Sequence, residues 1–176
     1  MTVQVFGVDD NGGLWHTVRG LGPYRDMDSQ TGIPWTGNVL DAACAMDDEG
    51  NLHVLVVTDC VDGIGRLWHT VRDAGGAWTR HNESGTSFGD VGRVVGGERG
   101  NFKAVAAYTI GLDLHVLAAT DNDVGDQNKL WHAVREPIDG VEIREGGTWS
   151  RFKAEGDQGQ ARKRQFSILE SVGIVQ

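Results

Sequence analysis

Short apolar segments alternate along the chain with segments rich in Asp, Asn and Gly. Their order repeats, so that one set of four in the middle of the chain is followed by a second set of four. The first set lies at residues 41–46, 52–59, 66–73 and 77–80, and the second at 102–110, 112–121, 129–136 and 148–153. Short segments of this kind, bounded by turn residues, predict antiparallel strands. We therefore expect two four-stranded meanders in these regions.

One six-residue phrase recurs in the third segment of each set and aligns the copies. It reads Leu-Trp-His-Thr-Val-Arg at 14–19 and 67–72, and Leu-Trp-His-Ala-Val-Arg at 130–135. In a strand, Trp68 and Thr70 point to one face while Leu67 and His69 point to the other. Both faces carry large side chains, which favours a sheet covered on both sides by neighbouring sheets. An internal repeat of this kind is typical of an architecture built from equivalent units.

The first copy begins late, and the chain ends with a surplus segment. Residues 3–6 stand where the second segment of the other copies stands, so the first copy lacks a first strand. Residues 165–175 form an apolar segment with no successors, and we expect this strand to complete the first copy. Radially repeated four-stranded sheets are β-propeller blades. The sequence thus predicts a single all-β propeller domain, residues 1–176, with blades at 3–40 plus 165–175, 41–90 and 101–155.

Three blades are few for a propeller, because such rings have roughly four to eight. A two-fold homodimer would have six, and closed two-fold dimers are the commonest soluble assembly. We therefore expect a homodimer, in which the C-terminal strand completes the first blade of its own chain or of its partner. A three-bladed monomer is the alternative.

The composition fits a folded β protein and excludes several partners. The 176-residue chain has 26 glycines and 3 prolines, which indicates many tight turns. Its formal charge of -9 argues against a nucleic-acid surface, and we expect the basic run 162–164 to be a solvated turn. No apolar run approaches the roughly 18 residues of a membrane span, and the first ten residues do not resemble a secretion signal. We expect a cytoplasmic protein, or one released without a conventional signal peptide.

The blades also resemble a known family. The stretch 3–16 contains Val-Phe-Gly, Asp-Asp-Asn-Gly and Leu-Trp-His, and Trp-Thr follows at 35–36. It resembles blades of the bacterial propeller lectins related to the Photorhabdus fucose-binding lectin, and is similar to the tectonin and tachylectin type of repeat. The resemblance covers nearly the whole chain and implies binding of fucosylated or O-methylated sugars in shallow pockets between blades. The chain departs from the family in having fewer blades, and in continuing the phrase as Thr-Val-Arg where the family often carries further aromatic residues.

A sugar site combines an aromatic plate for the C–H face of the ring with hydrogen-bonding side chains for its hydroxyl groups. The repeat supplies both once per blade. The candidate carbohydrate-binding residues are Trp35, Trp78, Trp149, Arg19, Arg72 and Arg135. The same residues also suit a structural role, since tryptophans fill gaps between blades and arginines bind carboxylates or turn carbonyls. The phrase tryptophans, Trp15, Trp68 and Trp131, are expected to be structural.

No catalytic or metal-binding constellation stands out from the repeat. The histidines recur at equivalent places in different blades, which gives no local spacing for a metal, and the turn Asp121–Asp126 is the best candidate for calcium. Cys44 and Cys60 are too far apart in the expected register for a disulfide and are predicted to be free thiols. We therefore expect no cofactor and no enzymatic activity, and a multivalent lectin as the function. A protein-interaction scaffold with every tryptophan in the core is the main alternative, and a glycosidase-like propeller is a further one.

Overall fold

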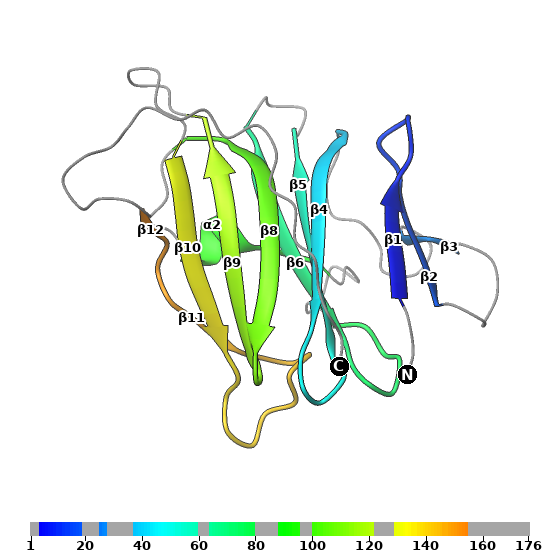
Figure 1. Cartoon of the computed structure of the whole chain (residues 1–176), viewed down its shortest axis with the longest axis vertical. Coiled ribbons are helices and arrows are strands. Elements are labelled where there is room, and N and C mark those ends of the chain that lie inside the picture. Colours follow the sequence, from blue (N-terminus) through cyan, green and yellow to red (C-terminus); the bar gives the residue numbers. More distant parts are fainter. Residues whose placement is uncertain are drawn as a thin grey trace.

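Three antiparallel sheets make up the described part of the chain (Figure 1). The computed structural model describes residues 4–18, 25–27, 37–59, 64–79, 88–95, 100–121 and 129–154. Strands dominate these residues, and the helix among them is the five-residue α2 (Val91–Val95). The expectation of an all-β fold is thus confirmed. Within these ranges, no helix is long and apolar enough to span a membrane.

Each sheet is a meander whose strands pair in nearly sequential order. The first sheet has the order β1-β2-β3, from β1 (Gln4–Val8), β2 (Leu14–Val18) and β3 (Arg25–Asp26). The second has the order β4-β5-β6-β7, from β4 (Val39–Met46), β5 (Leu52–Thr58), β6 (Arg66–Arg72) and β7 (Gly89–Asp90). The third has the order β11-β10-β9-β8, from β8 (Phe102–Ile110), β9 (Asp113–Thr120), β10 (Lys129–Glu136) and β11 (Thr148–Trp149), and β12 (Lys153–Ala154) also pairs with β10. The predicted order of the first three strands is confirmed in the second and third sheets. The fourth strand of the second sheet was predicted at 77–80, and this is wrong: β7 at Gly89–Asp90 pairs with β6, while Trp78 forms an isolated bridge to Arg72. Residues 165–175, expected to complete the first sheet, lie outside the described residues.

The repeated phrase occupies the same register in all three sheets. Its histidine stands opposite Phe6 in the first sheet, Leu55 in the second and Leu117 in the third. Alternation along the strand puts the phrase histidine and the phrase tryptophan on opposite faces. We call these the His face, which carries His16, His69 or His132, and the Trp face, which carries Trp15, Trp68 or Trp131.

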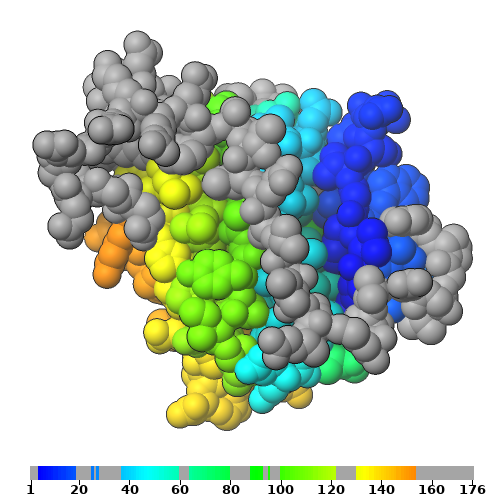
Figure 2. All heavy atoms as spheres, viewed as in Figure 1, coloured from blue at the N-terminus to red at the C-terminus, as the bar shows by residue number. Residues whose placement is uncertain are grey.

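The sheets pack in chain order, each with its His face on the Trp face of the next sheet. One core cluster joins Leu67 of the second sheet to Trp131 of the third, and another joins Leu14 of the first sheet to Trp68 of the second. The first and third sheets lie on opposite sides of the second, and the same order runs across the surface in Figure 2. All seven residues of β5 are buried, because the middle sheet is covered on both faces.

The two junctions between sheets use equivalent backbone hydrogen bonds. Val39 N, at the start of the second sheet, donates to Gly12 O of the first at 3.4 Å, and Phe102 N, at the start of the third, donates to Gly65 O of the second at 3.2 Å. A Cβ on Gly65 would lie 2.2 Å from the carbonyl oxygen of Phe102. Glycine is therefore required where the second sheet meets the third.

Candidate functional site

The second tryptophan of a sheet contacts the phrase histidine of the preceding sheet. The Trp78 ring meets His16 edge-on, with ring centroids 5.6 Å apart and an interplanar angle of 83°. Trp149 meets His69 in the same way, at 5.3 Å and 89°. Edge-to-face pairs of this kind are favourable. The structure thus places two of the predicted sugar-binding tryptophans at the junctions between sheets, where part of each ring is used in packing.

Each phrase histidine is held by a side chain of the neighbouring strand in its own sheet. The hydrogen-bonded pairs are His16–Gln4 at 2.9 Å, His69–His53 at 3.1 Å and His132–His115 at 3.1 Å. The rings of each histidine pair are stacked with centroids 5.3 Å apart. Two imidazoles share such a bond only while at least one ring is neutral, because a charged ring has no acceptor. The pairs therefore orient the histidine edge toward the next sheet and favour neutral rings.

A short motif, Gly-Gly-X-Trp followed by Thr or Ser, positions Trp78 and Trp149. Thr79 N donates to Val71 O at 2.7 Å, and Val71 N donates to Thr79 Oγ1 at 3.1 Å. Ser150 and Val134 repeat both contacts, each at 2.8 Å. The hydroxyl residue thus fixes the chain one residue beyond the tryptophan, which stands beside the phrase arginine.

The phrase arginine of the third sheet packs against the glycines of this motif. Arg135 is buried, and its Nη2 donates to the carbonyl oxygen of Ile143 at 2.7 Å and to that of Gly146. A Cβ on Gly147 would lie 2.4 Å from Arg135 Cζ, so the guanidinium requires glycine there. Burial lowers the pKa of Arg135 to about 10, which leaves it charged at neutral pH. Arg135, predicted to bind sugar, is thus hydrogen-bonded to the loop that carries Trp149.

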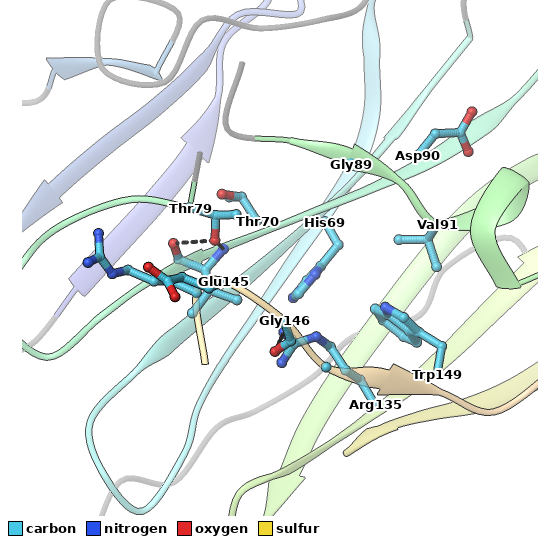
Figure 3. Close-up of a pocket in the computed structure, with 13 residues that line it drawn as sticks. His69, Thr70, Thr79, Gly89, Asp90, Val91, Arg135, Glu145, Gly146 and Trp149 are labelled. Carbon is cyan, nitrogen blue, oxygen red and sulfur yellow. Dashed lines mark hydrogen bonds between the residues drawn. The ribbon is translucent and has the colours of Figure 1, made fainter. Parts of the chain in front are cut away.

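A pocket of about 180 Å³ lies between the second and third sheets beside Trp149 (Figure 3). Its lining residues are His69, Thr70, Val71, Thr79, Gly89, Asp90, Val91, Arg135, Arg144, Glu145, Gly146, Gly147 and Trp149. Of the predicted binding residues, it brings together Trp149 and Arg135. Sites for drug-sized ligands measure roughly 300–1,000 Å³, so this pocket suits a smaller molecule.

Two polar atoms at this junction have no hydrogen-bond partner in the described part of the chain. They are Arg135 Nη1 and His53 Nε2, and both are buried. A third such atom, Thr70 Oγ1, lies on the Trp face with Trp68 and so faces the first sheet. Buried polar atoms are normally satisfied by protein, by water or by a ligand. Because Arg135 lines the pocket, an oxygen-rich ligand or ordered water is the chemistry that fits it.

A buried carboxylate balances the charge of Arg135. Asp47 Oδ2 lies 3.8 Å from His53 Nε2, and neither side chain has exposed surface. Burial acts to raise the pKa of Asp47, but the nearby His53 and hydrogen bonds from Asn51 outweigh it and hold the pKa below its usual value. Burial lowers the pKa of His53 below the usual histidine value, and the charge of Arg135 acts in the same direction. The junction thus holds a neutral histidine between an anion and a cation.

The first junction repeats part of this arrangement. Arg72 packs against Gly76, where a Cβ would lie 2.7 Å from its Nη2, and Trp78 contacts His16. Residues 19–24 and 28–36 lie outside the described residues. The structure therefore describes only the second-sheet half of an equivalent site.

Two predicted binding residues, Trp35 and Arg19, also lie outside the described residues. The chain order nevertheless separates Trp35 from the other two tryptophans. The short strand β3 precedes Trp35, whereas β7 and β12 follow Trp78 and Trp149. The Thr or Ser that follows each of the three tryptophans is too short a signal to align them.

Of the residues that line the pocket, only Trp149 and Arg135 were identified from the sequence. Thr70 and Asp90 line it from β6 and β7, but their side chains lie on the Trp face with Trp68. The Asp90 carboxylate accepts a hydrogen bond from Arg66 Nη1 at 3.2 Å.

The metal and cysteine expectations can be examined only in part. No group of three or more His, Cys, Asp or Glu side chains within the described ranges is placed to hold a metal ion. Of the candidate calcium turn, Asp121 is described and accepts hydrogen bonds from Asn101 N at 2.7 Å, with Lys103 Nζ at 3.0 Å. Cys44 is a free thiol, as expected, and burial raises its pKa. Cys60 lies outside the described residues.

No family model, curated protein or solved structure matches the chain. The resemblance to propeller lectins accordingly stays an expectation that rests on the sequence motif. Function is therefore argued from the residues of the pocket and their chemistry.

Proposed function

We propose that the protein is a non-catalytic carbohydrate-binding protein whose sugar site is the pocket between the second and third sheets. In this proposal the sheets are blades of a β-propeller, and the family resemblance suggests fucosylated or O-methylated sugars as ligands. One observation carries the proposal. The pocket combines the indole of Trp149 with Nη1 of Arg135, which has no partner among the described residues.

This combination suits the two-sided chemistry of a sugar. A hexose offers an apolar C–H face that packs on an aromatic ring, and a rim of hydroxyl groups. The Arg135 guanidinium only donates, and the Glu145 carboxylate, which also lines the pocket, only accepts. Because each sugar hydroxyl takes either role, one uncharged polyol can bind both groups.

A protein-interaction scaffold is the second candidate, and the packing of the tryptophans favours it. Trp78 and Trp149 use one ring edge against His16 and His69. If the rest of each ring is also structural, the pocket holds only water and the surface of the sheets binds a protein. The two candidates differ in one observable, which is whether any free sugar binds to the pocket.

Titration of the full chain with L-fucose, methylated fucose and galactose, followed by tryptophan emission and calorimetry, tests the proposal. Glu145→Gln removes a charged acceptor that lines the pocket and should weaken binding roughly tenfold or more, since hydrogen bonds to charged groups contribute about 1.5–3 kcal/mol. Thr70→Val removes a hydroxyl on the opposite face of the second sheet and should leave binding unchanged. Asp139→Asn, in an exposed turn, is the matched control and should bind like the parent chain.

The outcomes separate the candidates. Folded protein that binds none of these sugars on a glycan array contradicts the sugar proposal and supports the scaffold. Binding that Glu145→Gln leaves unchanged would place the sugar elsewhere. Hydrolysis of aryl glycosides would contradict the non-catalytic role and point to the carboxylate of Glu145, which lines the pocket.

A further inference from the structure

We propose that a second copy of this chain binds across the two outer faces of the sheet array, the His face of the third sheet and the Trp face of the first. Inside the chain these two kinds of face are joined twice. Both junctions have a backbone hydrogen bond from the first residue of the following sheet, Val39 or Phe102. Both also have the edge-on contact between tryptophan and histidine. The same pair of faces occurs once more, at the two ends of the array.

The outer faces expose apolar side chains at positions that the middle sheet buries. On the His face of the third sheet, Tyr108 is 43% exposed and Ile110 is 61% exposed, whereas Ala45, the counterpart of Tyr108 in the second sheet, is 8% exposed. On the Trp face of the first sheet, Val5 is 36% exposed, whereas its counterpart Val54 is 0% exposed. Exposed apolar residues that cluster on one face mark interaction surfaces.

The His face of the third sheet already has the side-chain geometry of a junction. Tyr108 stacks on His115, with ring centroids 4.7 Å apart. His115 shares a hydrogen bond with His132, as His53 does with His69 on the face that receives the third sheet. This face is therefore suited to pack against a Trp face. Within one chain, the Trp face that no other sheet covers belongs to the first sheet, at the opposite end of the array.

Two chains satisfy both outer faces at once. If the third sheet of each chain packs on the first sheet of the other, two identical junctions form and close a six-sheet ring with two-fold symmetry. Six blades lie within the range of propellers, roughly four to eight. If the proposed sugar function holds, each new junction also brings residues of two chains together at the place equivalent to the pocket. The sugar sites at the junctions between chains then form only in the dimer.

Light scattering during gel filtration of the full chain, over a range of concentrations, tests this proposal. The expected mass is twice the 19.0 kDa of one chain. Tyr108→Glu and Val5→Glu each place a charge in a junction, and each should raise the dissociation constant of the dimer about tenfold or more. Ile138→Glu changes a similarly exposed residue, at 40%, in the loop before β11, and as the matched control it should leave the dimer unchanged.

Mixing the two variants identifies the faces that meet. Tyr108→Glu alone and Val5→Glu alone each damage both junctions of a dimer, whereas a mixed dimer has one undamaged junction. The equimolar mixture should therefore associate more tightly than either variant. A 19.0 kDa monomer at every concentration would overturn the proposal and assign these faces to residues of the same chain, and a mixture that behaves like its components would also overturn it.

Two further measurements keep these outcomes clear. Circular dichroism of each variant shows whether it is folded, so that a loss of dimer is not confused with unfolding. The pocket between the second and third sheets lies within one chain, so a folded monomeric variant that still binds sugar leaves the proposed function intact. Failure of sugar binding with the dimer retained would affect the proposed function alone.

Discussion

The two junctions between sheets share their repeated contacts and differ in the polar contacts added to them. At both, a tryptophan meets a histidine edge-on and a backbone N–H donates to a glycine carbonyl. In the described part of the chain, the second junction adds three contacts from side chains. Asp41 Oδ2 accepts a hydrogen bond from Val105 N at 2.8 Å, and Thr109 Oγ1 donates to Met46 O at 2.7 Å. Arg144 Nε lies 3.3 Å from Asp73 Oδ2.

The repeated residues and the residues specific to the second junction thus contribute different kinds of contact. The repeated residues bury apolar area, which stabilises packing without specifying direction. The added residues are polar, so they fix how the two sheets are aligned and make the second junction sensitive to pH. The two histidine pairs differ in the same way, because His53 is fully buried beside Asp47 while His115 is half-buried beside Tyr108.

The largest expected effect comes from a core deletion at equivalent positions of the two junctions. Leu14 and Leu67 lie on His faces and are 1% and 0% exposed. Replacing either with Ala should lower the free energy of unfolding by about 2–5 kcal/mol, through lost burial and a residual cavity. Urea unfolding measures both variants. A much smaller decrease in the free energy of unfolding for Leu14→Ala than for Leu67→Ala would contradict the equivalence of the two junctions.

A smaller effect is expected from the carboxylate that is specific to the second junction. Asp41→Ala leaves Val105 N buried without its acceptor and should cost about 1–3 kcal/mol at neutral pH. Asp41→Asn keeps an acceptor oxygen and should cost less. Chemical unfolding of both variants at pH 7 checks this order, and equal losses would show that the hydrogen bond to Val105 is not what Asp41 contributes.

The pH dependence of Asp41 runs opposite to that of a stabilising carboxylate. Burial raises its pKa, so the folded state prefers the protonated form. This contribution is fully present below the unfolded pKa and is lost as the pH rises through the folded pKa. Asp41→Asn should therefore remove a decline in stability above the ordinary carboxyl range, and unfolding curves from pH 4 to 8 would show it.

The histidine pairs should differ in acid sensitivity. Because burial lowers the pKa of His53, the unfolded chain takes up the proton first, and stability falls as the pH drops below the usual histidine value, by at most about 1.4 kcal/mol per pH unit. His53→Gln copies the Gln4–His16 pair of the first sheet and should flatten this slope while keeping stability at pH 8. His115→Gln, at the half-buried pair, should change the slope less. A steeper effect at His115 would contradict the difference in burial.

Much of the fold was predictable because the repeat lines up residues of the same kind. Turn residues between apolar segments located most of the strands, and the phrase located β2, β6 and β10. The helix α2 was missed, since Val-Gly-Arg-Val-Val resembles a strand by composition. Its four-residue spacing puts Val91 and Val95 together in the core between the second and third sheets, and that core does not exist until the sheets pack.

The site was predictable only in part, because its residues meet across sheets. Trp149 and Arg135 could be found as repeated residues, but the contact of Trp149 with the histidine of the preceding sheet depends on three-dimensional packing. Thr70 and Asp90 line the pocket from β6 and β7, whose pairing no local pattern reveals. Trp35 stays a prediction, because it lies outside the described residues.

The contact between Trp149 and His69 tests the central claim most directly, because it joins one repeat to the next. A double-mutant cycle with Trp149→Leu and His69→Gln, measured by urea unfolding, should give a coupling of about 0.5–1.5 kcal/mol. A cycle with Trp78 and His16 should give a similar value. The crossed pair of Trp78 and His69, on opposite faces of the second sheet, should give a value near zero. Coupling absent from both matched pairs, or equal in the matched and crossed pairs, would contradict the repeated junction.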